Sequence, residues 1–518
     1  MPPVPQQTQK QIYEAPKMGG IQVGAVLAVI FGLLAGALGW VLIGRAGVTT
    51  VMTLLGVVVL GAVFSYLAWR NLVVLVCIWL FAMSGFRAYA MIPMPVLPDL
   101  SLERIIAVWL VILFSFRLLM RRDQLHGPWL VDIILLLHTL YVLANITYIG
   151  DSDIKHFWTL SSLSPLIGYF IGKQVINREK DVKFLFIFMF GVMVYYFVQS
   201  IAQKYHLNFL IWPKGILDMY QGIWPLGRSR GPFLHPPLFG QIMAMMLPFL
   251  FYFFFRVRSR IGKTLVLLCI VLGGLGLLYT YTRGPWLAAV VGMVALGVMR
   301  PHYRQLLTAM AVLVAMTAFF GVLQNLNSEL LQERVQNTET IGNRLAAMSA
   351  SLRMWRDHPL FGIGWFNWDI YYPKYLRGEE IPLYGYITQH TARGVVIHDI
   401  YWGRLAEEGL LSIALLTAAV GLVWFRFKRL WAVVHDSDWL NRDGLATIAG
   451  VIIIYAVGGV AIDYRYFDLV NALPYFLAGI IMGYRVPEHP PPPEPYANWT
   501  PPRFRNDSDQ DRPTAPQA

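Results

Sequence analysis

Residues 235–255 read His-Pro-Pro-Leu-Phe-Gly-Gln-Ile-Met-Ala-Met-Met-Leu-Pro-Phe-Leu-Phe-Tyr-Phe-Phe-Phe. This stretch contains no Asp, Glu, Lys or Arg, and the basic residues Arg256, Arg258, Arg260 and Lys263 follow it. A membrane-spanning helix needs about 20 mostly apolar residues, because hydrocarbon offers no partners for backbone polar groups. Residues 235–255 therefore predict a membrane span with a basic cluster at one end.

Segments of this kind recur along the chain. Its 518 residues are 56% hydrophobic and 14% charged, whereas soluble domains are roughly 45–50% apolar. The sequence predicts an all-α, polytopic integral membrane protein of about 12–14 transmembrane helices, the lower number applying if the short segments 72–84 and 158–174 do not cross fully. The predicted spans are 21–43, 47–69, 72–84, 102–119, 128–148, 158–174, 184–203, 235–255, 264–281, 284–299, 305–323, 402–425, 446–462 and 469–484.

The basic residues predict the orientation of these spans. The formal net charge is +12, but Lys and Arg occur in short clusters between apolar runs, which is typical of membrane topology signals and not of a nucleic-acid partner. If the N-terminus is cytoplasmic, nearly every strong cluster falls on the cytoplasmic side. The C-terminus then returns to the cytoplasm. Cys77 and Cys269 lie in apolar runs and predict no disulfide framework.

This orientation divides the chain into tails, helices and two long outer segments. We predict a cytoplasmic tail at 1–20, transmembrane helices over 21–323, a cap at 324–401, C-terminal transmembrane helices over 402–484 and a disordered Pro-rich cytoplasmic tail at 485–518. A further outer loop interrupts the helices at 204–234. Loops of such length are usually functional or disordered. The cap is rich in Trp and Tyr, and we expect interfacial helices near 341–357 and 396–409.

Three groups of arginines lie on the outer side. Arg283 stands in Thr-Arg-Gly-Pro-Trp at the outer end of a predicted span, where it can bind phosphate or anchor the helix among lipid headgroups. Arg228 and Arg230 precede the span 235–255 against the positive-inside trend, so a diphosphate or a protein carboxylate is expected to compensate them. Arg344 precedes Pro359-Leu-Phe-Gly-Ile-Gly364, whose glycines indicate a tight turn after a helix.

A histidine motif, His398-Asp-Ile-Tyr401-Trp, precedes Glu407-Glu408-Gly-Leu at the mouth of a predicted span. A neutral imidazole can accept a proton from a hydroxyl, as transfer to an alcohol requires, although a lone histidine is more often structural. Asp399 or Glu408 are candidates to orient the ring, and Tyr401 and Glu408 are candidate substrate contacts. The sequence has no glycine-rich phosphate loop, no Cys/His zinc spacing and no clustered aspartates for Mg²⁺, so we expect no metal or cofactor.

Taken in order, these motifs resemble those of the O-antigen ligase and O-antigen polymerase superfamily of bacterial envelope proteins. The resemblance rests on Arg230-Gly, Thr-Arg283-Gly, Arg344 ahead of Pro-Leu-Phe-Gly-Ile-Gly, and His398 ten residues before Glu408-Gly-Leu, and it covers roughly residues 220–425. The chain departs from the family pattern in having His-Pro-Pro at 235–237 where Asn-Pro-Asn is common, and His-Asp at 398–399 where His-Asn is common.

The resemblance implies a membrane glycosyltransferase acting at the periplasmic face of a bacterial inner membrane. The implied donor is a glycan on undecaprenyl pyrophosphate, and the acceptor hydroxyl belongs to lipid A-core, to another lipid-linked glycan or to a protein. His398 is implied as general base, and Arg283 and Arg344 as the groups that bind the departing diphosphate, with Arg230 assisting. The implied reaction is metal-independent and inverting.

Two other functions remain open from the residues alone. A transporter of lipid-linked oligosaccharide would need ionisable groups near the bilayer midplane, whereas here, apart from His138, they gather at the outer ends of spans. A non-catalytic scaffold would leave the outer arginines without a substrate. Ligase and polymerase differ in the acceptor alone, so the sequence does not separate them.

Overall fold

The structure is a computed structural model of the chain. It describes residues 65–66, 68–86, 91–92, 100–146, 158–218, 227–308, 339–376, 379–381, 385–387 and 397–486. Within these ranges the protein is almost wholly helical, with strands only in two very short antiparallel hairpins, which confirms the predicted all-α class. The predicted span 21–43, most of 47–69 and 305–323, the tail 1–20 and nearly all of the tail 485–518 lie outside the described residues.

The helices follow the predicted apolar segments closely. The predicted 102–119 and 284–299, for example, correspond to α4 and α12, whereas the two hairpins were not predicted. In chain order the elements are α3 (Leu72–Ala82), β1 (Met91–Ile92), β2 (Leu100–Ser101), α4 (Leu102–Leu119), α5 (Leu130–Ala144), the π-helix η2 (Thr159–Leu163), α7 (Ser164–Val175), α8 (Glu179–Lys204), α9 (Gly215–Asp218), the 3₁₀ helix η3 (Gly231–Phe233), α10 (Pro236–Arg256), α11 (Arg260–Leu278), α12 (Arg283–Met299), α15 (Glu339–Asp357), α16 (Trp368–Tyr375), β3 (Glu379–Ile381), β4 (Gly385–Ile387), α17 (Ile400–Val433), α18 (Arg442–Gly458) and α19 (Asp468–Gly483).

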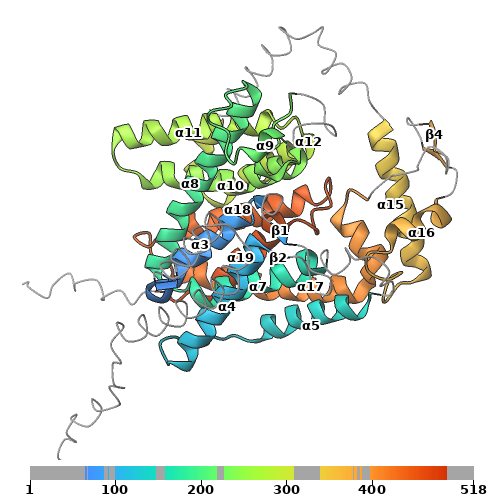
Figure 1. Ribbon diagram of the computed structural model, residues 1–518, viewed down its shortest axis with the longest axis horizontal. Helices are drawn as coiled ribbons and strands as arrows, with labels where there is room; N and C mark the ends of the chain where they lie inside the picture. The colour runs from blue at the N-terminus through green and yellow to red at the C-terminus, as the bar shows by residue number, and fades with distance from the viewer. Residues whose placement is uncertain are drawn as a thin grey trace, which may run out of the picture.

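Four of the described helices, α8, α10, α11 and α17, are long and apolar enough to cross a membrane. The apolar helices α3, α5, α12 and α19 are shorter. Most helices run along the long axis of the molecule, horizontal in Figure 1, while α15, α16 and the β3–β4 hairpin stand at its right-hand end. The chain is therefore a polytopic membrane protein, and the number of its crossings stays a prediction.

The helices pack through a central span and through glycines. Helix α10 packs against α8, α11, α12 and α18, so the uncharged stretch quoted above forms the middle of the bundle. Helices α7 and α19 pack most intimately, because a Cβ at Gly172 would meet the backbone of Phe476 and one at Gly479 would meet that of Tyr169. Membrane helices use such small residues to bring their backbones close, since lipid tails give no hydrophobic drive for association.

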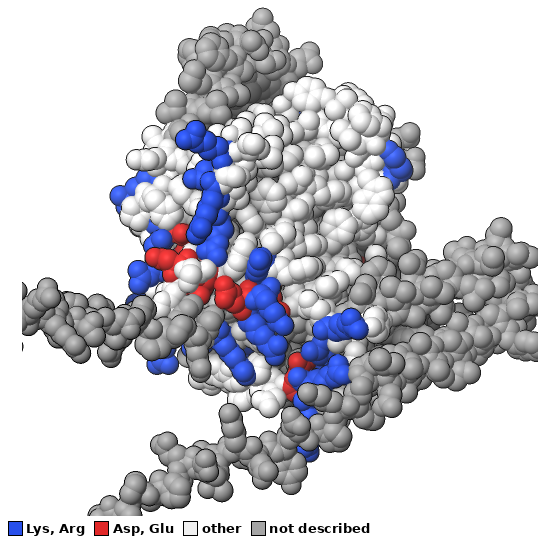
Figure 2. Space-filling model, turned by 90° about the vertical axis from the view of Figure 1, so that its left-hand side faces the viewer, with Lys and Arg blue, Asp and Glu red and all other residues white. Residues whose placement is uncertain are grey.

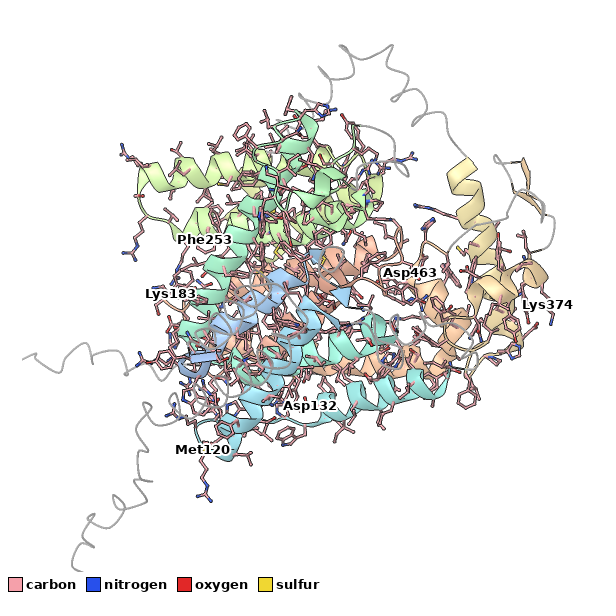
Figure 3. All side chains as sticks on the ribbon, in the orientation of Figure 1. Met120, Asp132, Lys183, Phe253, Lys374 and Asp463 are labelled. Atoms are coloured by element: carbon pink, nitrogen blue, oxygen red, sulfur yellow. The ribbon has the colours of Figure 1, made fainter. Side chains whose placement is uncertain are left out.

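Basic residues gather at one end of the bundle. Figure 2 views the molecule from the left-hand side of Figure 1, and Lys and Arg form a band across the described part of this face. Lys183 lies at this end, while Lys374 of α16 lies at the opposite one (Figure 3). Arg256, the first residue of the predicted cytoplasmic cluster that follows residues 235–255, donates to the Ser437 carbonyl at 2.8 Å. A basic band at one end of the bundle is what the positive-inside trend predicts for a cytoplasmic end.

Helix α17 is interrupted where it leaves the cap side. Gly409 has φ 68° and ψ −169°, outside the helical region, so the expected helix 396–409 and the span 402–425 meet at a break in one element. The Pro359–Gly364 turn fills this break. The amides of residues 410 and 411 donate to the carbonyls of 359 and 360 at 2.9 and 3.2 Å, and the amides of 363 and 364 donate to the carbonyls of 406 and 407 at 2.9 and 3.2 Å. Backbone groups freed inside a membrane helix need such partners.

Candidate functional site

Arg283 occupies the first turn of α12, and its side chain is exposed. Thr282 precedes the helix in an extended conformation. The next residue, Gly284, lies against the turn after α18, since a Cβ there would be 2.7 Å from the Ala461 Cβ. The glycine lets this turn approach the helix start closely, and the Arg283 guanidinium remains free of the packing. The sequence Thr-Arg-Gly thus places an accessible guanidinium at a crowded helix end.

Arg228 and Arg230 behave differently from Arg283, because both are buried, at 7% and 3% exposure. The Arg228 guanidinium donates to the Thr280 carbonyl at 3.1 Å and to the Thr282 hydroxyl at 2.8 Å. The Arg230 amide donates to the Gln203 side-chain oxygen at 2.8 Å. Arg228 therefore supports the turn that carries Arg283. The structure brings these two motifs together, and direct contact of Arg228 or Arg230 with substrate stays a prediction.

Arg344 lies in α15, and its side chain is exposed. Nearby protein atoms nevertheless remove part of the water around its guanidinium and lower its pKa, the charge of Arg283 lowers the pKa further, and Asp399 opposes this effect. Arg283 and Arg344, from segments 61 positions apart (344 − 283), are therefore close enough for their charges to interact. Two like charges repel, so the pair favours an anion between or beside them.

His398 lies immediately before α17, and its side chain is exposed. Nearby protein atoms nevertheless remove part of the water around the imidazole and lower its pKa, the charge of Arg344 lowers the pKa further, and Asp463 opposes both effects. His398 is therefore neutral at pH 7 and can accept a proton, as a general base must.

The residues that follow His398 fix it to the helix bundle. The Asp399 carboxylate caps α17 by accepting hydrogen bonds from the amides of Tyr401 at 2.7 Å and Trp402 at 3.0 Å. The Tyr401 hydroxyl donates to the Ala456 carbonyl at 2.6 Å, and its side chain is 44% exposed. The start of α17 is thus held against the end of α18. Tyr401 stays a candidate substrate contact, although its hydroxyl already binds the Ala456 carbonyl.

Glu408 lies inside the protein, at 1% exposure. Arg404 donates to its carboxylate at 2.9 Å, Arg465 at 3.3 Å, and the Ser412 hydroxyl donates to it as well. His138 lies 3.5 Å from the same carboxylate. Other side chains of the protein therefore already bind the Glu408 carboxylate, and its role as a substrate contact stays a prediction.

The buried charges form a larger network than the sequence indicated. Arg465 donates to Glu407 at 2.9 Å and to Asp463 at 2.8 Å, so it joins the turn after α18 to the glutamates of α17. Asp463, labelled in Figure 3, lies on the side of the bundle that faces α15. The charge of Asp463 raises the pKa of His398. Burial raises the pKa of Asp369, and the charge of Asp463 raises it further. The signal available in the sequence was the pair of adjacent glutamates before an apolar span.

These residues come from five segments: the turn before α10, the start of α12, α15, the start of α17 and the turn after α18. The arrangement offers guanidinium groups for a phosphate and a neutral imidazole for a proton. No group of three His, Cys, Asp or Glu side chains suited to a metal ion occurs among the residues that the structure describes.

Comparison with known families gives one match. Residues 268–390 match the model of the O-antigen ligase family, and no curated protein matches the chain. The matched segment contains Arg283, Arg344 and the Pro359–Gly364 turn, while Arg230 precedes it and His398 follows it by eight positions (398 − 390). The match confirms the resemblance found in the sequence: residues 268–390 of this chain are similar to the O-antigen ligase family.

Proposed function

We propose that the protein is a membrane glycosyltransferase of the O-antigen ligase type. It transfers a glycan from undecaprenyl pyrophosphate to a hydroxyl of lipid A-core or of another glycan. The family match supports a ligase- or polymerase-type glycosyltransferase in general. The finer proposal is supported by the exposed side chains of Arg283, Arg344 and His398. The charge of Arg283 acts on Arg344 and that of Arg344 acts on His398, as expected of a phosphate-binding pair beside a proton acceptor.

In the proposed reaction the acceptor oxygen attacks the anomeric carbon of the donor sugar. Its proton passes to a ring nitrogen of His398, and the bond between that carbon and the diphosphate oxygen breaks. The electron pair of this bond leaves with the diphosphate, whose growing negative charge Arg283 and Arg344 stabilise. One displacement with one base inverts the anomeric configuration. His398 takes up the proton of the acceptor, the two arginines offset the charge of the leaving diphosphate, and the proposed step proceeds without a metal.

The remaining candidate residues receive supporting roles in this proposal. Arg228 binds the turn that carries Arg283, and the buried Arg230 contributes its positive charge near the site. Glu408 anchors the start of α17 through the buried network, and Tyr401 lines the approach to His398. The cap, with α15 and α16, stands at the end of the bundle opposite the basic end, which supports a periplasmic site in a bacterial inner membrane.

The buried network is the one observation that would suit a transporter of lipid-linked oligosaccharide, because ionisable groups within membrane helices often carry transport. Its members on α17 lie at positions 404–412 of a helix that runs from Ile400 to Val433. They therefore sit near the cap side and not at the middle of the span, and each carboxylate is paired with an arginine. This favours a structural role beneath a site of chemistry at one face.

The test uses purified protein with an undecaprenyl-pyrophosphate-linked glycan and candidate acceptors. His398→Ala should lower the rate of transfer about 10²- to 10⁴-fold, the usual contribution of a general base. His358→Ala is the matched control, because His358 is an exposed histidine at the end of α15 whose imidazole is not needed by the proposal. Full transfer by His398→Ala would overturn the base assignment. Movement of the donor across liposomes without transfer to any acceptor would establish the transporter instead.

A further inference from the structure

A polar cavity of about 390 Å³ lies at the end of the bundle away from the cap, where the segment before α5 meets the ends of α17 and α19. Its charged and titratable lining consists of His126, Arg426 and Arg485. The proposed glycosyl transfer uses none of these residues. The rest of the lining is Leu125, Gly127, Pro128, Met482, Gly483 and Tyr484.

Neutral groups hold the two arginines of this cavity. A guanidinium nitrogen of Arg485 lies 2.8 Å from Nδ1 of His126, and Arg426 donates to the Tyr484 carbonyl at 3.0 Å. Within the described part of the chain neither arginine forms an ion pair. The Nε atom of Arg426 is buried and has no hydrogen-bond partner among the described residues. A buried donor without a partner is costly, so the cavity favours a ligand that accepts hydrogen bonds.

The nearby carboxylates are already neutralised by other cations. Asp123 accepts from Arg117 at 2.6 Å, and Asp132 accepts from Lys173 at 2.5 Å. Figure 3 labels Asp132 near the first turn of α5. The positive charges of Arg426 and Arg485 are therefore left over in the cavity, which predicts a negatively charged occupant.

The surfaces beside the cavity are apolar and exposed. On α5 and just before it, Trp129 is 45%, Leu130 55% and Ile133 51% exposed, and on α17 Trp424 is 50% and Phe425 65% exposed. Helices α5 and α17 pack side by side along the lower edge of the molecule in Figure 1. Large apolar side chains on the outside of membrane helices face lipid tails. An occupant with acyl chains can thus lie against these helices while its polar end enters the cavity.

We propose that this cavity binds the phosphate of an anionic phospholipid headgroup, whose acyl chains lie against α5 and α17. Guanidinium groups bind phosphate through paired hydrogen bonds, and basic pockets between membrane helices on the cytoplasmic side recognise such headgroups. The basic band of Figure 2 lies on this side of the bundle, which the positive-inside trend predicts to face the anionic cytoplasmic leaflet. A zwitterionic headgroup brings its own ammonium group toward the two arginines and binds more weakly.

The experiment titrates phosphatidylglycerol or phosphatidylethanolamine against the full-length protein, and native mass spectrometry counts the bound lipids. Arg426→Gln with Arg485→Gln should weaken binding of phosphatidylglycerol about 30-fold, because each basic residue near an anionic lipid contributes roughly a fivefold preference. Arg485→Gln alone should weaken binding of phosphatidylglycerol about fivefold. Because the Arg485 side chain is exposed, this substitution should leave folding intact. Arg258→Gln with Arg260→Gln removes the same charge from exposed positions at the start of α11 and is the matched control.

Support requires a phosphatidylglycerol molecule that the wild type and the α11 control retain and that both cavity variants bind more weakly. Equal binding by the cavity variants and the wild type would overturn the site. Equal retention of phosphatidylglycerol and phosphatidylethanolamine would overturn the anionic preference. A third arm adds inorganic phosphate, and displacement of the lipid by millimolar phosphate would make the free anion the occupant and refute the lipid assignment. None of these readouts depends on glycosyl transfer.

Discussion

Gly409→Ala should destabilise the protein strongly, because the break in α17 depends on a glycine. The backbone at Gly409 has φ 68° and ψ −169°, a region that residues with a Cβ rarely adopt. A Cβ there would also meet the carbonyl group of Leu360 and lie 2.6 Å from the Gly362 amide nitrogen. The alanine must therefore change the helix backbone, displace the Pro359–Gly364 turn, or both.

The magnitude follows from the contacts at the break. Strain of this kind costs about 1–3 kcal/mol. Displacing the turn also weakens the four backbone hydrogen bonds of 2.9–3.2 Å across the break, each worth about 1 kcal/mol net. We expect a loss of about 3 kcal/mol or more in the free energy of unfolding. Gly421→Ala in the same helix is the control, because a Cβ there meets nothing within 4 Å, and alanine should stabilise the helix by about 0.5–1 kcal/mol.

The assay is unfolding of the purified variants in mixed micelles by titrated sodium dodecyl sulfate, followed by the change in tryptophan fluorescence. Trp365 is a useful reporter, since it lies next to the turn and is 1% exposed. Glycosyl transfer by Gly409→Ala should fall in parallel, because the break joins the cap to the helix that follows His398. If Gly409→Ala were as stable as Gly421→Ala, the reasoning from the helix break would be refuted.

Two further predictions concern charge. The transfer rate should be constant near neutral pH and fall in acid with an apparent pKa below 6.5, because the pKa of His398 is lowered and only its neutral form accepts a proton. Arg344→Gln removes a positive charge and should raise this apparent pKa, so an unchanged pH profile would contradict the proximity of the two groups. Glu408→Gln leaves Arg404 and Arg465 undercompensated in a buried place and should lower the free energy of unfolding by about 3–5 kcal/mol. A loss below 1 kcal/mol in the same micelle titration would argue against the network.

The class of the protein and most of its helices could be predicted from the sequence. Apolar runs long enough to span a membrane are a property of consecutive residues, so α4 at Leu102–Leu119 has the bounds that were predicted. The clustering of Lys and Arg is equally local, and it matches the basic end of the bundle in Figure 2. Both signals arise because water and hydrocarbon impose opposite demands on neighbouring stretches of chain.

The candidate site was only partly readable. The motifs of Arg283, Arg344 and His398 were identified in the sequence, but their common location depends on contacts between distant segments. From the sequence, Arg228, Arg230 and Arg283 were all candidates to bind phosphate. In the structure Arg228 and Arg230 are buried, whereas Arg283 is exposed. Burial depends on what packs over a side chain, which no local pattern reports.

By itself the sequence determined that this chain is an all-α polytopic membrane protein, and it predicted that the candidate site motifs lie on one side of the membrane. Only the tertiary structure decided which of these distant segments pack against one another. Glu408-Gly-Leu reads as the entry to a continuous apolar helix, and the break at Gly409 exists because the Pro359–Gly364 turn, far away in the chain, supplies the missing backbone partners. Hydrophobicity is a sum over neighbouring residues, whereas hydrogen bonds and buried charges require particular atoms to meet in space.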